Sequence, residues 1–292
     1  MKKQIAFLLV CALLFALAGC AARAEDISVV ATFYPVYVLA ENVLSGVPGV
    51  TLSSMTPPST GCLHDYQLLT SDMRALGKAK ALLINGAGME SFLPDVTGQF
   101  PDLAIVDCSQ GVELMAEETG HGEWNAHIWL DPQNAIRMVE NLGDGLSALL
   151  PDSAETIRLN AEAYIARLSA LDAELSEAIG ALPHKEIVTF HEAFPYFAKR
   201  YGLTVCAVVT LEPDEPVSPR MLRNVIQTVK EAGNPPLFSE PQYENSALST
   251  IAAETGAPVY ELDPLVTGDG SLTAYEDVMR KNLAVLREAL GN

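Results

Sequence analysis

Short apolar runs alternate with longer amphipathic segments along most of the chain. The runs at 81–84 (Ala-Leu-Leu-Ile) and 103–106 (Leu-Ala-Ile-Val) are apolar at every position, which is typical of strands buried on both faces of a parallel sheet. The segments between such runs carry apolar residues at helical spacing. This alternation predicts an α/β protein with doubly wound parallel sheets.

The pattern divides into two α/β halves. In the first half we expect strands at 27–32, 50–55, 81–85 and 103–107, with helices at 35–45 and 68–77. In the second half we expect strands at 186–190, 204–209, 236–239 and 259–262, with helices at 192–201, 219–232, 244–255 and 274–290. The segments at 30–35 and 188–191 each turn from a strand toward a helix, a short echo that favours two related halves.

A long helical region separates the halves. Asp131-Pro132 opens a first helix, Pro151 ends it, and Asp152 or Ser153 can cap a second helix that runs to about residue 181. The second helix has about 28 residues and a length of roughly 40 Å. Its apolar positions form one stripe: Ile157, Ala161, Tyr164, Leu168, Leu171, Leu175 and Ile179. We therefore predict two doubly wound βα lobes, at 27–150 and 183–292, joined by a long rigid helix at 151–182; a packed surface helix would show the same stripe.

The N-terminus has the features of an export signal. Lys2 and Lys3 precede an apolar run at 5–18, which is too short to span a bilayer comfortably and fits a signal-peptide core. The run ends in Leu-Ala-Gly-Cys at 17–20, which resembles a bacterial lipoprotein signal. We expect a signal peptide at 1–19, a lipidated Cys20 and a tether at 20–26, with a plain secretory signal cut after Ala24 as the alternative. No later apolar run is long enough for a transmembrane helix.

The chain is strongly acidic. It carries 18 Lys and Arg against 37 Asp and Glu, a formal net charge of −19. Loss of residues 1–19 removes two lysines and changes the charge to −21. This balance excludes nucleic acid as a partner, because a phosphate backbone requires clustered Lys and Arg. It is compatible with a cation as ligand, although a soluble acidic surface is the better explanation of the charge alone.

Four residues of metal-ligand type follow predicted strands. His64, His127 and His191 follow the strands at 50–55, 103–107 and 186–190, and Asp263 follows the strand at 259–262. Ligands of open α/β sheets bind beyond the carboxyl ends of the strands, so we expect these side chains to meet in the cleft between the lobes. Three imidazoles and a carboxylate complete a tetrahedral zinc shell with no position left for water. A closed shell favours holding the ion over using it in catalysis.

Two further residues stand close to these candidates. Glu240 ends the strand at 236–239, and we expect it to orient a ligand histidine, with direct metal ligation as the alternative. Cys62 lies two residues before His64, so both side chains could face the same way in an extended loop. Its thiolate could approach the metal, or Cys62 could be a small buried loop residue.

Several segments together resemble a known family. They are Ala31–Pro35 (ATFYP), 61–66 (GCLHDY), 125–132 (NAHIWLDP), 191–198 (HEAFPYFA), 215–219 (EPVSP), 239–242 (SEPQ) and 262–265 (LDPL). In order and spacing these segments resemble the zinc and manganese substrate-binding proteins of bacterial ABC importers, over nearly the whole mature chain. The resemblance implies two lobes joined by a long helix with the metal between them. It also implies His64, His127, His191 and Asp263 as the ligands.

The resemblance also carries an expectation about metal and function. Family members specific for manganese tend to have Glu at the position of His191, so Zn²⁺ is favoured here and Mn²⁺ is the alternative. The chain is then expected to be a monomeric lipoprotein, anchored through Cys20 to the outer face of a bacterial membrane, at the cell surface or in the periplasm. It would pass zinc to an ABC permease with a cytoplasmic ATPase, and would not be an enzyme. The other classes considered are a zinc hydrolase with Glu192 or Glu240 as base, and an adhesin with a structural zinc.

Overall fold

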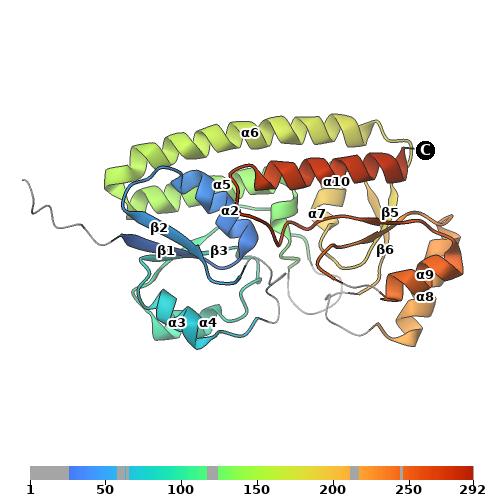
Figure 1. Cartoon of the computed structure of the whole chain (residues 1–292), viewed down its shortest axis with the longest axis horizontal. Helices are drawn as coiled ribbons and strands as arrows, with labels where there is room; N and C mark the ends of the chain where they lie inside the picture. Colours follow the sequence, from blue (N-terminus) through green and yellow to red (C-terminus); the bar gives the residue numbers. More distant parts are fainter. Residues whose placement is uncertain are drawn as a thin grey trace, which may run out of the picture.

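Two four-stranded parallel sheets, each at the centre of an α/β lobe, lie end to end beneath one long helix (Figure 1). The computed structural model describes residues 26–57, 63, 66–116, 124–210, 217–243 and 246–291. The predicted fold of two doubly wound βα lobes with a long helix is confirmed. Among the helices of these residues, none combines the length and the apolar character needed to cross a membrane.

The first sheet has the strand order β2-β1-β3-β4. Its strands are β1 (Ile27–Ala31), β2 (Val50–Ser54), β3 (Ala81–Ile84) and β4 (Ala104–Asp107). Strand β3 is buried at every position, as its apolar run predicts. Helices α2 (Tyr34–Leu44) and α5 (Pro132–Leu149) pack against the sheet, while α3 (Thr70–Leu76) and α4 (Leu93–Gln99) lie on its other side (Figure 1).

The second sheet repeats this topology with the order β6-β5-β7-β8. Its strands are β5 (Glu186–Thr189), β6 (Thr204–Val208), β7 (Leu237–Ser239) and β8 (Val259–Glu261), and its helices are α7 (Pro195–Tyr201), α8 (Pro219–Glu231) and α9 (Ser246–Thr255). Strands β1 and β5, which carry the sequence echo, hold the same place in their sheets. The repeated order supports two related halves, and it brings the carboxyl ends of all strands of a sheet to one edge.

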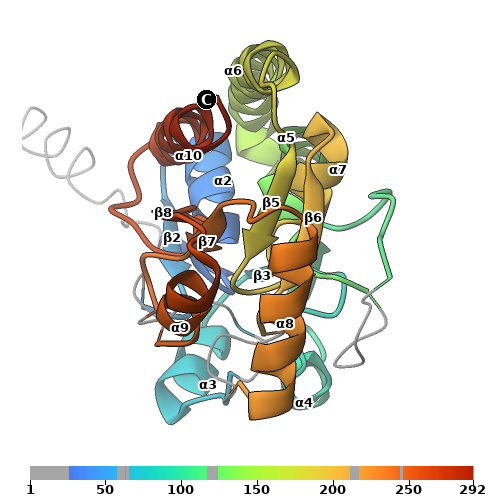
Figure 2. The same ribbon diagram turned by 90° about the vertical axis from the view of Figure 1, so that its right-hand side faces the viewer.

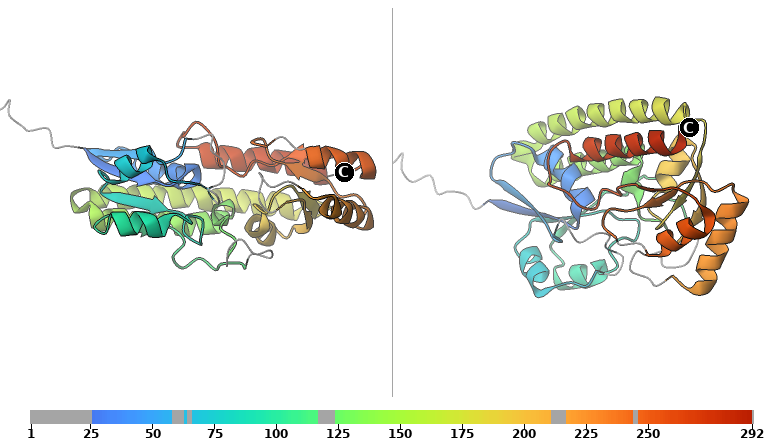
Figure 3. Two further views of the ribbon diagram at one scale, coloured as in Figure 1. Left: turned by 90° about the horizontal axis from the view of Figure 1, so that it is seen from below. Right: turned by 45° about the vertical axis from the view of Figure 1, so that its right-hand side comes forward.

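Helix α6 (Ala154–Gly180) contacts elements of both lobes. It packs against α2 and α5 on the side of the first sheet and against α7 on the side of the second (Figure 3). The last helix, α10 (Ala274–Leu290), returns from the second lobe to lie beside α6 (Figure 2). The apolar stripe predicted for α6 is buried throughout its length. This packing favours the spanning helix over an independent surface helix.

Asp172 ties α6 to its neighbours. Its carboxylate accepts hydrogen bonds from Gln133 Nε2 in α5 (2.9 Å), and from Arg200 Nε and Tyr201 Oη in α7 (both 3.0 Å). Burial opposes ionisation of this carboxyl group, but the hydrogen bonds from Arg200, Gln133 and Tyr201 prevail and lower its pKa. The ionised carboxylate thus fixes the helix between the lobes.

Two details differ from the sequence-based expectations. Helix α4 was not expected, because only Val96 of its seven residues is buried and it contains Pro94 and Gly98. Helix α7 begins at Pro195 and not at residue 192. Proline disfavours helical geometry in the residue before it and is well tolerated in the first turn, so residues 192–194 form a turn that leaves the Glu192 carbonyl available to a partner outside the helix.

A buried carboxylate joins the carboxyl ends of β1 and β3. Glu90 Oε1 accepts from Thr32 Oγ1 and from the Asn85 backbone N–H, each at 2.8 Å, and Oε2 accepts from the Gly86 N–H at 3.1 Å. Asn85 Nδ2 in turn donates to the Ala126 carbonyl at 2.9 Å, next to His127. Burial raises the pKa of Glu90 to about 7, against the lowering effect of these donors.

Leu171 and Leu159 test the packing of α6. Leu171 is 0% exposed and Leu159 is 56% exposed, on the same helix. Leu171→Ala should lower the free energy of unfolding by about 2–5 kcal/mol, because it leaves a cavity between the helix and the lobes. Leu159→Ala should change it by less than about 0.5 kcal/mol. Urea unfolding followed by circular dichroism measures both, and equal effects of the two variants would show that α6 is not packed as described.

Glu90 should make stability depend on pH. The folded state holds the Glu90 proton up to about pH 7, whereas the unfolded state loses it near 4.5, the ordinary pKa of a glutamate. The contribution of Glu90 to stability is therefore complete below pH 4.5 and falls as pH rises toward 7. Urea unfolding of the wild type and of Glu90→Gln measures this effect. Between pH 4.5 and pH 8, the free energy of unfolding of the wild type should fall by about 3 kcal/mol relative to that of the variant. A stability difference between the wild type and Glu90→Gln that does not change with pH contradicts the assignment.

Candidate metal centre

The segment that carries His127 is held firmly in place. It leads into a short 3-10 turn at Ile128–Leu130, whose central residue, Trp129, is completely buried. Trp129 Nε1 donates to the Pro264 carbonyl at 2.8 Å, and the Trp129 ring meets the Phe33 ring edge to face. The contact with Pro264 comes from the segment after β8, so His127 stands where the two lobes meet.

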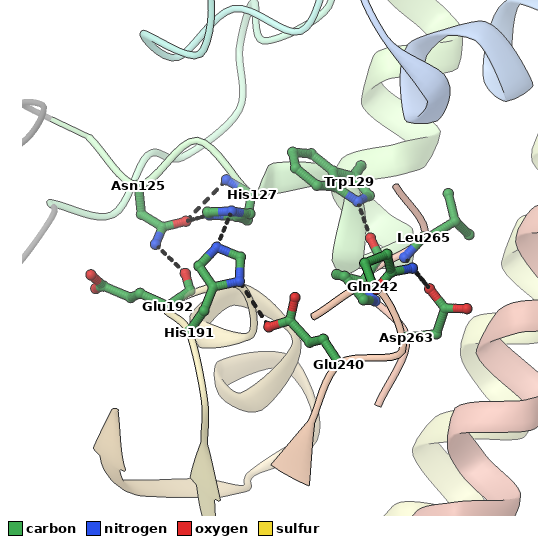
Figure 4. Close-up of polar contacts among 10 residues, drawn as sticks. Asn125, His127, Trp129, His191, Glu192, Glu240, Gln242, Asp263 and Leu265 are labelled. Carbon is green, nitrogen blue, oxygen red and sulfur yellow. Dashed lines mark hydrogen bonds and ion pairs between the residues drawn. The ribbon is translucent and has the colours of Figure 1, made fainter. Parts of the chain in front are cut away.

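His191 lies just beyond the carboxyl end of β5. Its side chain is completely buried, and its Nδ1 lies 2.8 Å from Oε1 of Glu240 at the end of β7 (Figure 4). Glu240 is itself only 2% exposed. Because a carboxylate accepts hydrogen bonds, it fixes the proton of His191 on Nδ1 and leaves the Nε2 lone pair pointing the other way. This is the contact expected of Glu240 from the sequence.

The two histidines approach each other through their Nε2 atoms. The distance between His127 Nε2 and His191 Nε2 is 3.0 Å, and the ring centroids lie 4.8 Å apart (Figure 4). These residues are 64 positions apart in the sequence and come from different lobes. The structure therefore brings together two of the four predicted metal ligands.

The tautomer of His127 follows from Asn125. Asn125 Nδ2 donates to the Glu192 carbonyl at 2.9 Å, and its Oδ1 accepts from the His127 backbone N–H at 3.0 Å. This fixes the amide with its oxygen toward the imidazole, where Oδ1 lies 3.3 Å from His127 Nδ1. Nδ1 must then be the donor, so the neutral ring carries its lone pair on Nε2. Both Nε2 atoms of the pair are acceptors.

Two acceptor nitrogens at this distance suit a shared cation. Zinc binds histidine nitrogen at about 2.0–2.1 Å with tetrahedral angles, which places two ligand nitrogens about 3.3 Å apart. The observed 3.0 Å is within a few tenths of an ångström of that value. The pair can therefore receive a divalent ion with only a small displacement of the two rings.

Asp263 does not contact the histidine pair. Its Oδ1 accepts from the Leu265 backbone N–H at 2.9 Å and from Gln242 Nε2 at 3.2 Å. Figure 4 shows Gln242 between Asp263 and the pair. Both donors bond Oδ1, and the assignment of Asp263 as fourth ligand stays a prediction.

The remaining predicted residues lie outside the described part of the chain. His64 and Cys62 fall between the described residues 57 and 66, and Cys20 precedes residue 26. Within the described ranges, no group of three or more His, Cys, Asp or Glu side chains is arranged to hold a metal ion. Of the four predicted ligands, the described residues include His127, His191 and Asp263, and only the first two lie against each other through their Nε2 atoms.

Sequence reasoning missed Asn125 as part of this centre. The residue precedes His127 by two positions and is 3% exposed. Asparagine two residues before a candidate ligand was a signal of an orienting partner, since an Asx side chain readily bonds the backbone two residues ahead. Its bond to the Glu192 carbonyl, by contrast, has no local signal.

Comparison with known proteins places the chain in a family. Residues 29–289 match the family described as zinc-uptake complex component A, periplasmic (ZnuA). The zinc-binding lipoprotein AdcA of Streptococcus pneumoniae serotype 4 is 30% identical over 309 residues, covering 98% of this chain and 61% of that protein. The chain thus spans about three-fifths of the length of this curated relative.

Solved structures agree in fold. A zinc-bound ZnuA with residues 138–173 deleted matches with a TM-score of 0.80 and 26% identity, covering 92% of this chain and 99% of that one. The substrate-binding protein FpvC of Pseudomonas aeruginosa in complex with Mn²⁺ matches with a TM-score of 0.82 and 26% identity, covering 91% and 99%. With the family match over most of its length, the chain belongs to the ZnuA family.

Proposed function

We propose that this protein is an extracytoplasmic solute-binding lipoprotein that captures Zn²⁺ and delivers it to the permease of an ABC importer. The close approach of the His127 and His191 Nε2 atoms, both held as acceptors, carries this proposal. An ion bound there bridges the two lobes, which is the arrangement a carrier needs to couple binding to lobe closure. His64 and Asp263 are proposed to complete the shell.

The surroundings of the pair favour capture over catalysis. The Glu240 carboxylate, one of the two candidate bases for a hydrolase, already bonds His191 Nδ1 and is almost completely buried. A metal hydrolase also requires an open coordination position for water, whereas the proposed shell is closed. We therefore propose a non-enzymatic role in which the metal is the transported substrate.

Zinc is the preferred ion on ligand chemistry. Neutral imidazoles are borderline donors that suit Zn²⁺, while Mn²⁺ prefers oxygen ligands and stands at the weak end of the divalent series. Among relatives, AdcA is named a zinc-binding lipoprotein, and FpvC has been solved with Mn²⁺. Manganese therefore remains the alternative substrate for this chain.

The proposed route of delivery depends on the N-terminus. AdcA is a lipoprotein by name, which supports lipidation of Cys20 after removal of residues 1–19. The anchored monomer would hold its metal site at the outer face of the membrane. It would then dock on a permease driven by a cytoplasmic ATPase.

His127 and His191 should each be necessary for tight zinc binding. Changing either residue to Ala removes one Nε2 donor, and zinc affinity should fall by more than about 100-fold, beyond the typical effect of losing an outer partner. His184→Ala is the matched control, because His184 is exposed before β5, and it should bind as the wild type does. Competition with a fluorescent zinc chelator measures all three. Wild-type affinity in His127→Ala or His191→Ala would refute the site.

Asp263→Ala in the same assay tests the fourth ligand separately. A loss comparable to that of the histidine variants supports direct ligation. Unchanged affinity removes Asp263 from the shell and leaves the histidine pair in place. In that case Asp263 serves as the acceptor of the hydrogen bonds from Leu265 and Gln242 and does not bind the metal.

Zinc should displace manganese from the wild-type protein. With equal total concentrations of the two ions, equilibrium dialysis followed by metal analysis should recover the protein with zinc, because the imidazole pair favours the softer ion. Preferential recovery of manganese would show that the substrate is Mn²⁺. The assignment of the metal site and of the family would not change.

A further inference from the structure

The segment before His127 is bonded to the second lobe at two adjacent places. Asn125 Nδ2 donates to the carbonyl of Glu192, which directly follows His191. The Asn125 carbonyl accepts from Tyr196 Oη at 2.8 Å, and the same hydroxyl accepts from the Met115 backbone N–H at 2.9 Å. Asn125 and Tyr196 are both 3% exposed. These three bonds join the chain between β4 and the 3-10 turn to the turn after β5 and to the first turn of α7.

The contacts also stiffen the segment on its own side. The Asn125 N–H donates to the Met115 carbonyl at 2.9 Å, and Ala116 pairs with Trp124 in an antiparallel bridge. Residues 115 and 125 are thus held together as one unit, and Tyr196 Oη bonds both of them. Separation of the lobes must break the bonds of this unit to Tyr196 and Glu192 together.

The same side chain controls His127. Asn125 Oδ1 is the acceptor for His127 Nδ1, and the direction of its amide is set by the Glu192 carbonyl that Nδ2 binds. When the bond to Glu192 breaks, the amide loses one of the two contacts that keep its oxygen toward the imidazole, and only the His127 backbone N–H still holds Oδ1. The Nδ1 proton, and with it the Nε2 lone pair, is then held less firmly in position.

We propose that Asn125 and Tyr196 form an interlobe latch that couples separation of the lobes to the orientation of His127. Closed, the latch presents His127 Nε2 to the metal. Opened, it loosens the orientation of the His127 ring as His191 moves away with the second lobe, so one motion weakens both donors to the ion. The part of this inference that concerns the metal rests on the proposed function. The latch itself consists of hydrogen bonds between protein groups and does not depend on metal binding.

Two variants separate the parts of the latch. Tyr196→Phe keeps the ring and removes only the hydroxyl that bonds Asn125 and Met115. Asn125→Asp keeps an acceptor for His127 Nδ1 but cannot donate to the Glu192 carbonyl. Asn125→Ala removes both functions. Asn141→Ala is the matched control, because Asn141 Nδ2 likewise donates to backbone carbonyls, those of Cys108 and Gln110, but within one lobe.

The first measurement uses the zinc-free full chain. Hydrogen exchange, read by NMR or mass spectrometry, should show faster exchange of the Met115 amide in Tyr196→Phe by about 10-fold, because that amide loses its acceptor and the lobes open more often. Asn125→Asp should accelerate exchange in the 113–116 segment similarly, and Asn141→Ala should not. Exchange in Tyr196→Phe and Asn125→Asp equal to that of Asn141→Ala would overturn the latch, whether or not the protein binds zinc.

The second measurement uses the zinc-loaded chain. Stopped-flow dissociation into excess chelator should be faster in Asn125→Ala by about 10–100-fold, the effect of losing an orienting partner. Tyr196→Phe should accelerate it by up to about 10-fold through lobe opening alone. Asn125→Asp should lose less equilibrium affinity than Asn125→Ala. If the wild type binds no zinc, the proposed function is wrong. If the wild type binds zinc and these variants release it at the wild-type rate, the proposed coupling between the latch and His127 is wrong.

Discussion

The arrangement of this protein depends on two imidazole nitrogens that face each other at 3.0 Å with both lone pairs directed inward. Two such acceptors repel each other in the absence of a proton or a metal ion between them. Their positions are maintained because the Nδ1 atom of each ring contacts a fixed acceptor, the Asn125 amide for His127 and the Glu240 carboxylate for His191. Such outer partners fix both the tautomer and the direction of a ligand.

The fold supplies what these partners need. The two sheets share one strand order, so each directs the ends of its central strands toward the junction of the lobes. Helix α6 packs against both lobes, and Asp172 bonds helices on either side of it. A long helix in this position restricts wide hinge motion, and small displacements are enough to separate two donors that are 3.0 Å apart.

Much of this could be predicted from the sequence because it depends on local pattern. The stripe of α6 follows from a helical period, and the positions of His127, His191 and Glu240 follow from their places after strands. The beginning of α7 was misjudged because Pro195 excludes the preceding turn from the helix. The bond from Asn125 to Glu192 joins residues 67 positions apart, and only the packing of one lobe on the other creates it. For Asp263, the sequence indicates the edge of the sheet but not the direction of the carboxylate, which Leu265 and Gln242 determine.

The most direct test of the central claim is a crystal structure of the zinc-loaded protein with anomalous scattering at the zinc edge. The account predicts one zinc ion between the lobes, at about 2.0–2.1 Å from Nε2 of both His127 and His191, with Asn125 still bonded to His127 Nδ1 and Glu240 to His191 Nδ1. A zinc ion bound through Nδ1 of either ring, or bound without both histidines, would contradict it.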